Sequence, residues 1–336
     1  MEEFDFRSLH PNVFLGTASD RYAGWIGQIY TPGRYESRIT RRKHAVGGKS
    51  FEEQVLPLDS VEEFFQHFRV LELDFTFYRP LLGKDGEPTP NLQVLESYRR
   101  HLARDSRLML KVPQAVFAQK VRRGSGYLEN AEYLNAEVFR RQFYEPAVAL
   151  LGESIAGFVF EQEYQRKPDR LPAPRLAEAL DDFFSSIPRD GRYHVELRTE
   201  GYLAPPVFAV FEKHGIGQVL SHWTWLPPLA RQFSLSDNRV LNSRRQLILR
   251  LLTPRGMRYE DAYAMAYPFR ELREDMLDPL MVRQTAELMH AGVAQKAQVN
   301  VLVNNRAGGN APLIARRIAS EFLHPGSAAH EAPSGD

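Results

Sequence analysis

Eight short apolar segments recur in order along this chain, and seven of them end in a charged or amide side chain. Segments of this length are typical of strands that are buried on both faces of a parallel sheet. Helical patterns lie between them, and this alternation over eight strands predicts a closed (β/α)₈ barrel of the TIM type, in the α/β class. The segments are Val13–Thr17, Arg69–Asp74, Leu108–Lys111, Gly157–Glu161, His194–Arg198, Val219–His222, Leu247–Arg250 and Val301–Asn305.

The length of the chain favours a single domain with long loops. It has 336 residues, whereas a barrel of this type typically takes about 250. The excess falls in the connections after the first, sixth and seventh strands, which are residues 18–58, 223–245 and 253–290. We therefore predict a barrel domain over 1–324, with 18–58 as an inserted loop region. The remaining residues, 325–336, are rich in Pro, Ala, Ser and Gly and are predicted to be a disordered tail.

The inserted region carries six basic side chains within a short stretch. A solvated, partly mobile insertion explains them, and so does a lid or anion-steering loop, because strand-to-helix loops lie on the active face of a barrel. These side chains are Arg38, Arg41, Arg42, Lys43, His44 and Lys49.

The composition excludes several classes of protein. Lys and Arg number 43 and Asp and Glu number 42, so a net charge of +1 provides no overall field to hold a nucleic-acid backbone or an anionic membrane. There is no cysteine, which excludes disulfides, thiol catalysis and cysteine-ligated zinc. No signal-peptide pattern is present, and no apolar stretch approaches the ~20 residues of a membrane span. We therefore expect a soluble, cytoplasmic protein.

The polar ends of the strands predict where the functional site lies. Side chains at i and i+2 share one face of a strand, and a barrel builds its site at the C-terminal ends of its strands. If these faces point to the barrel axis, the polar side chains converge on one pocket. The catalytic candidates are Glu161, Glu196, His222 and Asp74. The candidate binding residues are Glu72, Tyr78, Lys111, Arg198, Arg250, Asn304, Asn305, Arg306, Gly308, Gly309 and Asn310.

Each candidate also has a structural interpretation. Buried charges that bind no ligand must pair with one another, so the set could be a closed ion-pair network that fills the barrel mouth. His222 is suited to exchange a proton near neutral pH, but a single buried histidine is as often a packed core residue. The guanidinium groups of Arg198, Arg250 and Arg306 favour an anionic ligand, because guanidinium pairs bidentately with carboxylate or phosphate.

A divalent metal is a weaker alternative for the same pocket. The four catalytic candidates are of the types that bind such an ion through oxygen and nitrogen. No HxH or HExxH spacing accompanies them, so the sequence assigns no cofactor.

The loop after the last strand contains Gly308 and Gly309 just before a helix predicted over 312–323. Such a helix N-terminus favours an anion, and barrels often bind phosphate at the loops after strands seven and eight. A tight turn is the alternative explanation for the two glycines. Three aromatic side chains could present a flat face to a ring or sugar, although aromatic residues are more often packing residues. They are Tyr78, Trp25 and Tyr202.

The strand motifs together resemble the domain-of-unknown-function-72 family, also called YecE-like, over roughly residues 13–323. The most specific piece is Leu71–Tyr78, which resembles the family's "VEINSTFY". The opening segment Val13–Thr17, with Trp25, Gly27, Tyr30 and Pro32, looks like "GTSGW…W.G.FYP". Further pieces are Leu110–Pro113, His194–Arg198 and Val303–Pro312, which resemble "LKAP", "AVEFRH" and "FNN…G.AP.NA". The resemblance implies a TIM-type barrel and no established reaction.

The chain departs from the family pattern at several site positions. Asp74 stands where the family usually has Asn, and Thr199 and Arg306 stand at two usual His positions. The other departures are residues 160–164 in place of "LQLPP", Leu251 and Leu252 in place of "HG", and Ile314 at the last Asn. We therefore expect a divergent member whose pocket is more acidic near the fourth strand and poorer in histidine.

Three functions follow from these patterns. The favoured one is an enzyme that uses acid/base groups and arginine electrostatics on a small anionic polar metabolite, such as a sugar phosphate or a carboxylate. The alternatives are a non-catalytic binding barrel and a nucleic-acid-processing protein, and the balanced charge argues against the second of these. We expect no membrane partner, and the sequence predicts no oligomeric state.

Overall fold

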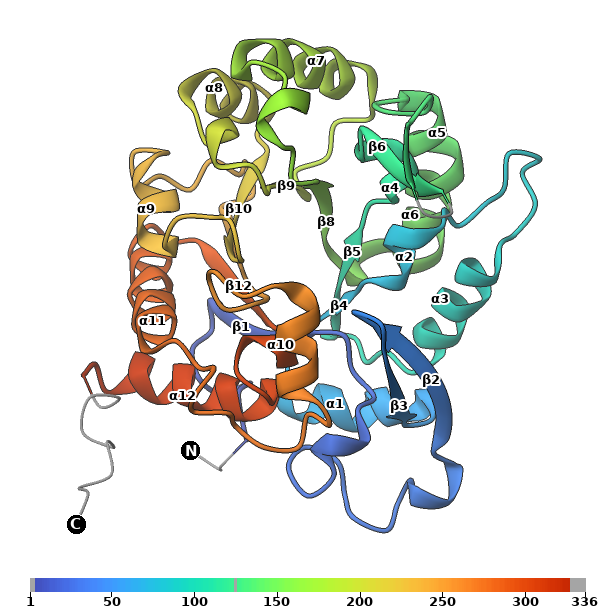
Figure 1. Cartoon of the computed structure of the whole chain (residues 1–336), viewed down its shortest axis with the longest axis vertical. Helices are drawn as coiled ribbons and strands as arrows, with labels where there is room; N and C mark the ends of the chain where they lie inside the picture. The colour runs from blue at the N-terminus through green and yellow to red at the C-terminus, as the bar shows by residue number, and fades with distance from the viewer. Residues whose placement is uncertain (1–3, 124–125, 327–336) are drawn as a thin grey trace.

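Eight parallel strands close into a barrel in the computed structural model, which describes residues 4–123 and 126–326 (Figure 1). The order around the barrel is β1-β12-β11-β10-β9-β8-β5-β4, and β4 pairs back to β1. The strands are β1 (Val13–Ala18), β4 (Val70–Leu73), β5 (Arg107–Lys111), β8 (Ile155–Gln162), β9 (Tyr193–Leu197), β10 (Gly217–His222), β11 (Gln246–Leu251) and β12 (Gln298–Val303). The predicted α/β barrel is confirmed, and each expected apolar segment overlaps one strand.

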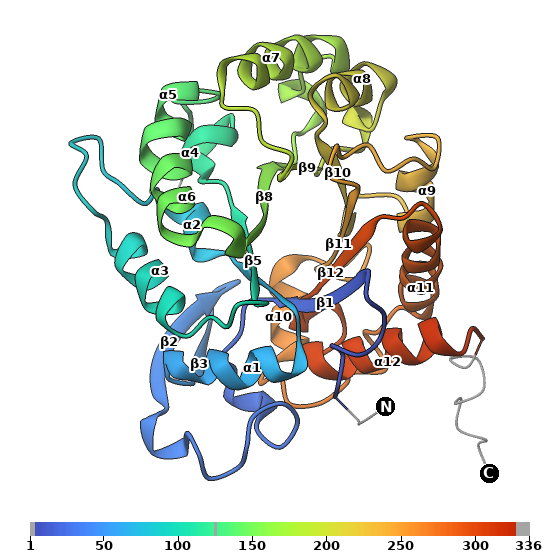
Figure 2. The same cartoon turned by 180° about the vertical axis from the view of Figure 1, so that it is seen from behind.

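Helices form an outer layer around the strands in Figure 1, and Figure 2 shows the same layer from behind, with α11 beside α12 and α7 beside α8. The helices are α1 (Val61–His67), α2 (Phe75–Tyr78), α3 (Pro90–Arg100), α4 (Gln114–Phe117), α5 (Ala136–Phe139), α6 (Glu145–Leu151), α7 (Ala173–Ser186), α8 (Pro205–His214), α9 (Leu229–Ser234), α10 (Tyr259–Ala266), α11 (Pro279–Ala294) and α12 (Ala311–Leu323). A π-helical turn over Arg140–Tyr144 joins α5 to α6. No described helix is long and apolar enough to cross a membrane.

Two antiparallel hairpins are added to the barrel. The first, β2 (Thr40–Val46) with β3 (Lys49–Val55), occupies much of the inserted region 18–58. It packs on α10, where the Tyr263 hydroxyl donates to Glu53 at 2.6 Å. The second, β6 (Lys120–Arg123) with β7 (Gly126–Glu129), follows β5 and was not predicted. Both hairpins lie in strand-to-helix connections and therefore on the C-terminal face of the barrel.

The barrel interior is layered. Apolar side chains from six strands form one cluster, in which Val70, Met109, Val159 and Ile248 stand two residues before Glu72, Lys111, Glu161 and Arg250. Because side chains alternate along a strand, the charged residues share the inward face and form the next layer toward the C-terminal ends. The predicted tail, 325–336, lies almost entirely outside the described residues.

Candidate functional site

Six charged side chains from five strands meet inside the barrel and pair with one another. Three are carboxylates and three are cations, and we call them the charged network. Arg198 directly follows β9, and the other five lie within their strands. The members are Glu72, Lys111, Glu161, Glu196, Arg198 and Arg250, all of them predicted site residues.

Arg250 is the centre of the charged network. Its Nε and Nη2 atoms donate to the two carboxylate oxygens of Glu72 at 2.7 and 2.5 Å. Its Nη1 atom pairs with Glu196 and lies 3.7 Å from Glu161 Oε2. Since β11 is a barrel neighbour of neither β4 nor β9, these contacts cross the interior. The forked contact with Glu72 is the bidentate geometry that makes arginine–carboxylate pairs strong.

Arg198 and Lys111 complete the network. Arg198 Nη1 lies 2.7 Å from Glu161 Oε1, and its Nη2 lies 3.3 Å from Glu196 Oε2. Lys111 pairs with the other oxygen of Glu161. The Arg198 side chain is the most exposed member, at 17%, and its guanidinium lies 5.1 Å from the ring centroid of Trp223. The six charges thus neutralise one another, as in the closed network that the sequence left as an alternative.

Burial and ion pairing act in opposite directions on the carboxylates. Burial alone would raise the pKa of Glu161, but the three cations of the network outweigh it and hold that pKa at about 2. Burial also acts to raise the pKa of Glu196, and Arg198 and Arg250 again bring it below its usual value. Both carboxylates are therefore ionised at neutral pH and carry no proton to donate.

These depressed pKa values predict acid lability. The folded pKa of Glu161 lies below its ordinary value of 4.5, so its stabilising contribution is present above about pH 4.5 and is lost as pH falls toward 2. We expect about 2 kcal/mol of unfolding free energy to disappear from this group between pH 7 and pH 3. Urea denaturation at both pH values measures the loss, and the Glu161→Gln variant should show a smaller one. An equal loss in the variant would contradict the assignment.

The structure does not bring His222 to the network. Arg250 pairs in register with Ser221, so Ser221 is the inward residue of β10, and its hydroxyl donates to Glu196. His222 pairs with Leu251 on the opposite face, which packs toward the helices. It is 3% exposed, and burial lowers its pKa to about 4, so the ring is neutral at pH 7. This is the environment of a core histidine.

The side-chain oxygens of two asparagines at the start of α12 are already bonded. Asn305 Oδ1 accepts from the backbone N–H of Ala311 at 2.8 Å, and Asn310 Oδ1 accepts from that of Leu313 at 2.9 Å. Asn305 Oδ1 also accepts from the indole of Trp25 at 3.1 Å. Asn310 Nδ2 in addition donates to the Phe269 carbonyl oxygen at 2.8 Å. These two asparagines therefore stabilise the helix start and anchor the first connection to it.

The glycines of this loop are covered by the segment before α11. A Cβ on Gly309, whose φ is +101°, would lie 2.4 Å from the carbonyl oxygen of Glu271. A Cβ on Gly308 would lie 2.9 Å from Leu277. The glycines thus permit close packing and a left-handed turn, which is the alternative explanation given above.

Two charged side chains at the strand ends lie outside the network. Within the described residues, neither Asp74, which is exposed, nor Arg306, which is half-buried, has an ion-pair partner. The Arg306 guanidinium lies 4.4 Å from the ring centroid of Tyr259, and its backbone N–H donates to the buried Asn304 at 3.0 Å. Tyr78, 70% exposed, lies within electrostatic range of Asp74, Tyr259 and Arg306. We call Asp74, Tyr78, Tyr259 and Arg306 the mouth group.

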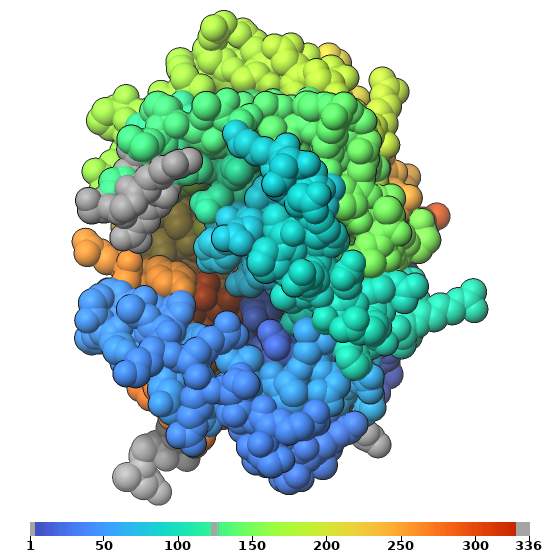
Figure 3. All heavy atoms as spheres, turned by 90° about the vertical axis from the view of Figure 1, so that its right-hand side faces the viewer, coloured from blue at the N-terminus to red at the C-terminus, as the bar shows by residue number. Residues whose placement is uncertain are grey.

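A hollow in the surface lies between the segment with β2 and β3, in blue, and the segment with α2 and α3, in teal (Figure 3). Orange and red atoms of the C-terminal part of the chain are visible in its depth. Side chains from the beginning and the end of the chain thus border the same depression.

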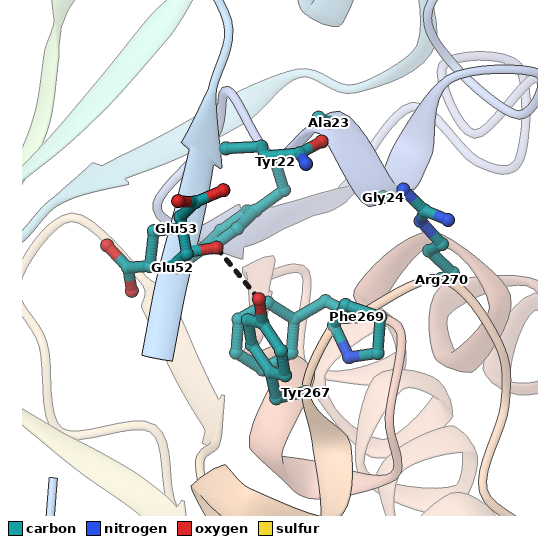
Figure 4. Close-up of a pocket in the computed structure, with 10 residues that line it drawn as sticks. Tyr22, Ala23, Gly24, Glu52, Glu53, Tyr267, Phe269 and Arg270 are labelled. Atoms are coloured by element: carbon teal, nitrogen blue, oxygen red, sulfur yellow. Dashed lines mark hydrogen bonds between the residues drawn. The ribbon is translucent and has the colours of Figure 1, made fainter. Parts of the chain in front are cut away.

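A cavity of about 250 Å³ lies between the 3₁₀ turn Ala23–Trp25, β3 and residues 267–270 (Figure 4). The connections after β1 and β11 meet here, because only β12 separates these strands in the barrel. The Tyr267 hydroxyl donates to the Glu52 carbonyl oxygen at 2.8 Å across one side. The lining includes Tyr22, Phe269, Glu53 and Arg270. Sequence reasoning missed this cavity, since its walls come from two connections more than 200 residues apart in the chain.

The side chains considered above as a weaker alternative for a metal site do not form one group among the described residues. Among the described residues, no group of three or more His, Asp or Glu side chains is placed to hold a metal ion. Glu161 and Glu196 bind the network cations, Asp74 stands outside the network, and His222 is on the outer face of β10. The aromatic candidates also divide, because Trp25 and Tyr202 are buried at 0% and 1% exposure whereas Tyr78 is exposed.

Residues 14–335 match the profile of a family described as "Protein of unknown function DUF72". The fold is similar to the crystal structure of a DUF72 family protein from Enterococcus faecalis V583, with 16% identity, a TM-score of 0.55 and coverage of 93% of this chain and 95% of that one. A DUF72 family protein from Thermotoga maritima MSB8 gives 14% identity, a TM-score of 0.55 and coverage of 93% and 98%. These structural likenesses show the fold alone. No protein with a curated description matches the chain.

Proposed function

Because the chain belongs to the DUF72 family, a family of unknown function, we propose a function from its own residues: the barrel mouth binds a small polar molecule through an anionic group on that molecule. Arg306 is the proposed partner of this group. The observation that carries the proposal is that this half-buried guanidinium has no carboxylate partner within the described chain. Guanidinium groups in such a position pair strongly with carboxylate or phosphate.

The surrounding side chains support a small polar ligand. Asp74 offers an acceptor for hydroxyl groups, and the phenols of Tyr78 and Tyr259 offer donors and flat faces. The charged network beneath them is neutral overall, so it adds rigidity without demanding a counter-ion of its own. A sugar phosphate or a carboxylated sugar combines the anionic group and the hydroxyls that this arrangement selects.

If the bound molecule is also a substrate, Asp74 is the proposed acid/base group. Glu161 and Glu196 are committed to ion pairs that hold them ionised. Asp74 is exposed and has no ion-pair partner in the described part of the chain, so its carboxylate is free to accept a proton from a bound hydroxyl group. A binding function without turnover uses the same mouth group and needs no proton transfer.

Calorimetric titration of ribose 5-phosphate, glucose 6-phosphate and glucuronate tests the proposal. We expect at least one of them to bind more tightly than uncharged ribose or glucose. Arg306→Gln should weaken that binding about 10- to 100-fold, because a charge-assisted hydrogen bond contributes about 1.5–3 kcal/mol. Arg283→Gln is the matched control, since Arg283 is exposed on α11 in the outer helical layer.

The results separate binding from catalysis. If Arg306→Gln and Arg283→Gln bind every anion as the native chain does, the proposed charge partner is wrong. If NMR shows conversion of a bound probe, Asp74→Asn should abolish the conversion while changing the affinity little. Binding with no conversion of any probe limits the function to binding.

A further inference from the structure

Four exposed aromatic side chains stand on the C-terminal face of the barrel. Among the described residues, six large apolar side chains are more than 40% exposed. Four of these are aromatic, and each lies shortly after the C-terminal end of a barrel strand: β4, β8, β10 or β11. The other two are the aliphatic Leu128 and Leu323. The four are Tyr78, Tyr164, Trp225 and Tyr259. Because each follows the C-terminal end of a barrel strand, they stand around the mouth of the barrel.

Two of the four belong to a compact aromatic cluster. The ring of Tyr164 lies 5.8 Å from that of Trp225 and 6.2 Å from that of Trp223, at interplanar angles of 34° and 53°. Trp223 is held in turn by Arg198, at 5.1 Å, and Arg198 is fixed by its ion pairs with the charged network. We call Tyr164, Trp223 and Trp225 the ring platform. Its outer members keep 41% and 48% of their surface exposed.

The charge beside the platform is positive. Arg166 and Lys167 lie two and three residues after Tyr164, are exposed, and have no ion pair with any carboxylate among the described residues. The nearby carboxylates are engaged: Glu163 accepts from the backbone N–H groups of Gln119 and Lys120, and Asp169 pairs with Lys120. An anionic ligand that approaches the platform therefore meets two exposed cations that pair with no carboxylate of the described chain.

From this arrangement we infer that the ligand of the mouth carries a flat aromatic ring in addition to its anionic group, and that this ring stacks on the platform at Trp225. A nucleoside phosphate has this chemistry. The inference rests on the proposed function for the anionic group, whereas the ring subsite is built from different residues. Exposed aromatic faces beside cations favour a conjugated ring, because stacking and electrostatic attraction then act on the same molecule.

Tryptophan fluorescence reports on this subsite directly. The chain has three tryptophans, and Trp25 is fully buried, so a ligand that stacks on the platform changes the emission of the other two. The probes are adenosine 5′-monophosphate, adenosine, ribose 5-phosphate and inorganic phosphate. We expect the nucleotide to quench the emission and to bind about tenfold or more tightly than ribose 5-phosphate. Adenosine should quench with lower affinity.

The variant Trp225→Ala should reduce nucleotide affinity to that of ribose 5-phosphate and leave the latter unchanged. Trp225→Phe, which keeps a ring, should retain most of the nucleotide affinity. Leu323→Ala, a truncation at similar exposure on the end of α12, should change neither affinity. A thermal melt of each variant confirms that the barrel is folded.

The outcomes distinguish this inference from the proposed function. Equal affinities for the nucleotide and ribose 5-phosphate, with no effect of Trp225→Ala, overturn the ring subsite and leave the anion site standing. An equal loss of ribose 5-phosphate affinity in Trp225→Ala also overturns it, because the platform then holds a sugar. If no phosphate compound binds but adenosine quenches through Trp225, the ring subsite stands and the anion site fails. Failure of all four probes overturns both.

Discussion

Replacing Arg250 by leucine is expected to lower the free energy of unfolding by about 3–5 kcal/mol. Arg250 is 2% exposed and binds both carboxylate oxygens of Glu72 as well as Glu196. Removal of the guanidinium leaves the buried Glu72 with no ion pair among the described residues and Glu196 with that of Arg198 alone, and this loss of counter-charge is the cost. Urea denaturation followed by far-UV circular dichroism at pH 7 measures it.

An exposed ion pair provides the matched control. Arg239 Nη1 lies 2.7 Å from Glu212 Oε1, and both side chains are at least half exposed. Arg239→Leu should therefore change stability by about 1 kcal/mol or less. If the two leucine variants were equally stable, the ion pairs of the charged network would contribute no more to the free energy of unfolding than an exposed pair does. The role of the network as a rigid base for the mouth would then be contradicted.

This role connects stability with binding. Arg198 belongs to the network and at the same time lies against Trp223 of the ring platform. Lys111 pairs with Glu161 and lies 4.0 Å from the ring centroid of Phe77, next to Tyr78. The network thus fixes two aromatic side chains at the opening. A rigid support of this kind reduces the entropy that a ligand must overcome to order its site.

The sequence was sufficient for the barrel and for most of the network. Glu72, Glu161 and Arg250 each follow an inward apolar residue by two positions, so the period of a strand identified their shared face. For His222 this reasoning was not sufficient. The segment Val219–His222 is buried on both faces, and period-two alternation alone could not decide whether Ser221 or His222 points inward. The register with Arg250 on the neighbouring strand decided it.

The loop after β12 and the aromatic residues depended on long-range packing. The spacing of Gly308, Gly309 and Asn310 suits both an anion site and a capped turn, and the choice between them is set by residues 271–277, which cover the loop. Likewise, Trp25 is buried whereas Trp225 is exposed, because distant segments of the chain cover only the first of them. Neither the role of the loop nor the burial of the tryptophans can be read from local sequence spacing, since both depend on which distant segment packs over these residues.

The change of Gly16 to alanine should be as severe as the loss of Arg250. Gly16 lies on β1 and pairs with Val70 of β4, where the first two strands of the barrel meet. A Cβ at this position would lie 1.8 Å from the carbonyl oxygen of Val70 and 2.7 Å from its Cγ1 atom. The backbone contact cannot be relieved by rotating a side chain, so strand pairing must shift. We expect a loss of at least about 3 kcal/mol or failure to accumulate as folded protein.

Soluble yield and urea denaturation measure this effect, and two further variants define its cause. Gly126→Ala adds the same methyl group where no atom of the described residues lies within 4 Å, so it should leave stability nearly unchanged. Adding Val70→Ala to Gly16→Ala removes the side-chain contact but keeps the carbonyl oxygen, and should not restore the native stability. Recovery in that double variant would instead show that the barrel interior is overpacked at Val70, and that strand β1 tolerates a Cβ at its junction with β4.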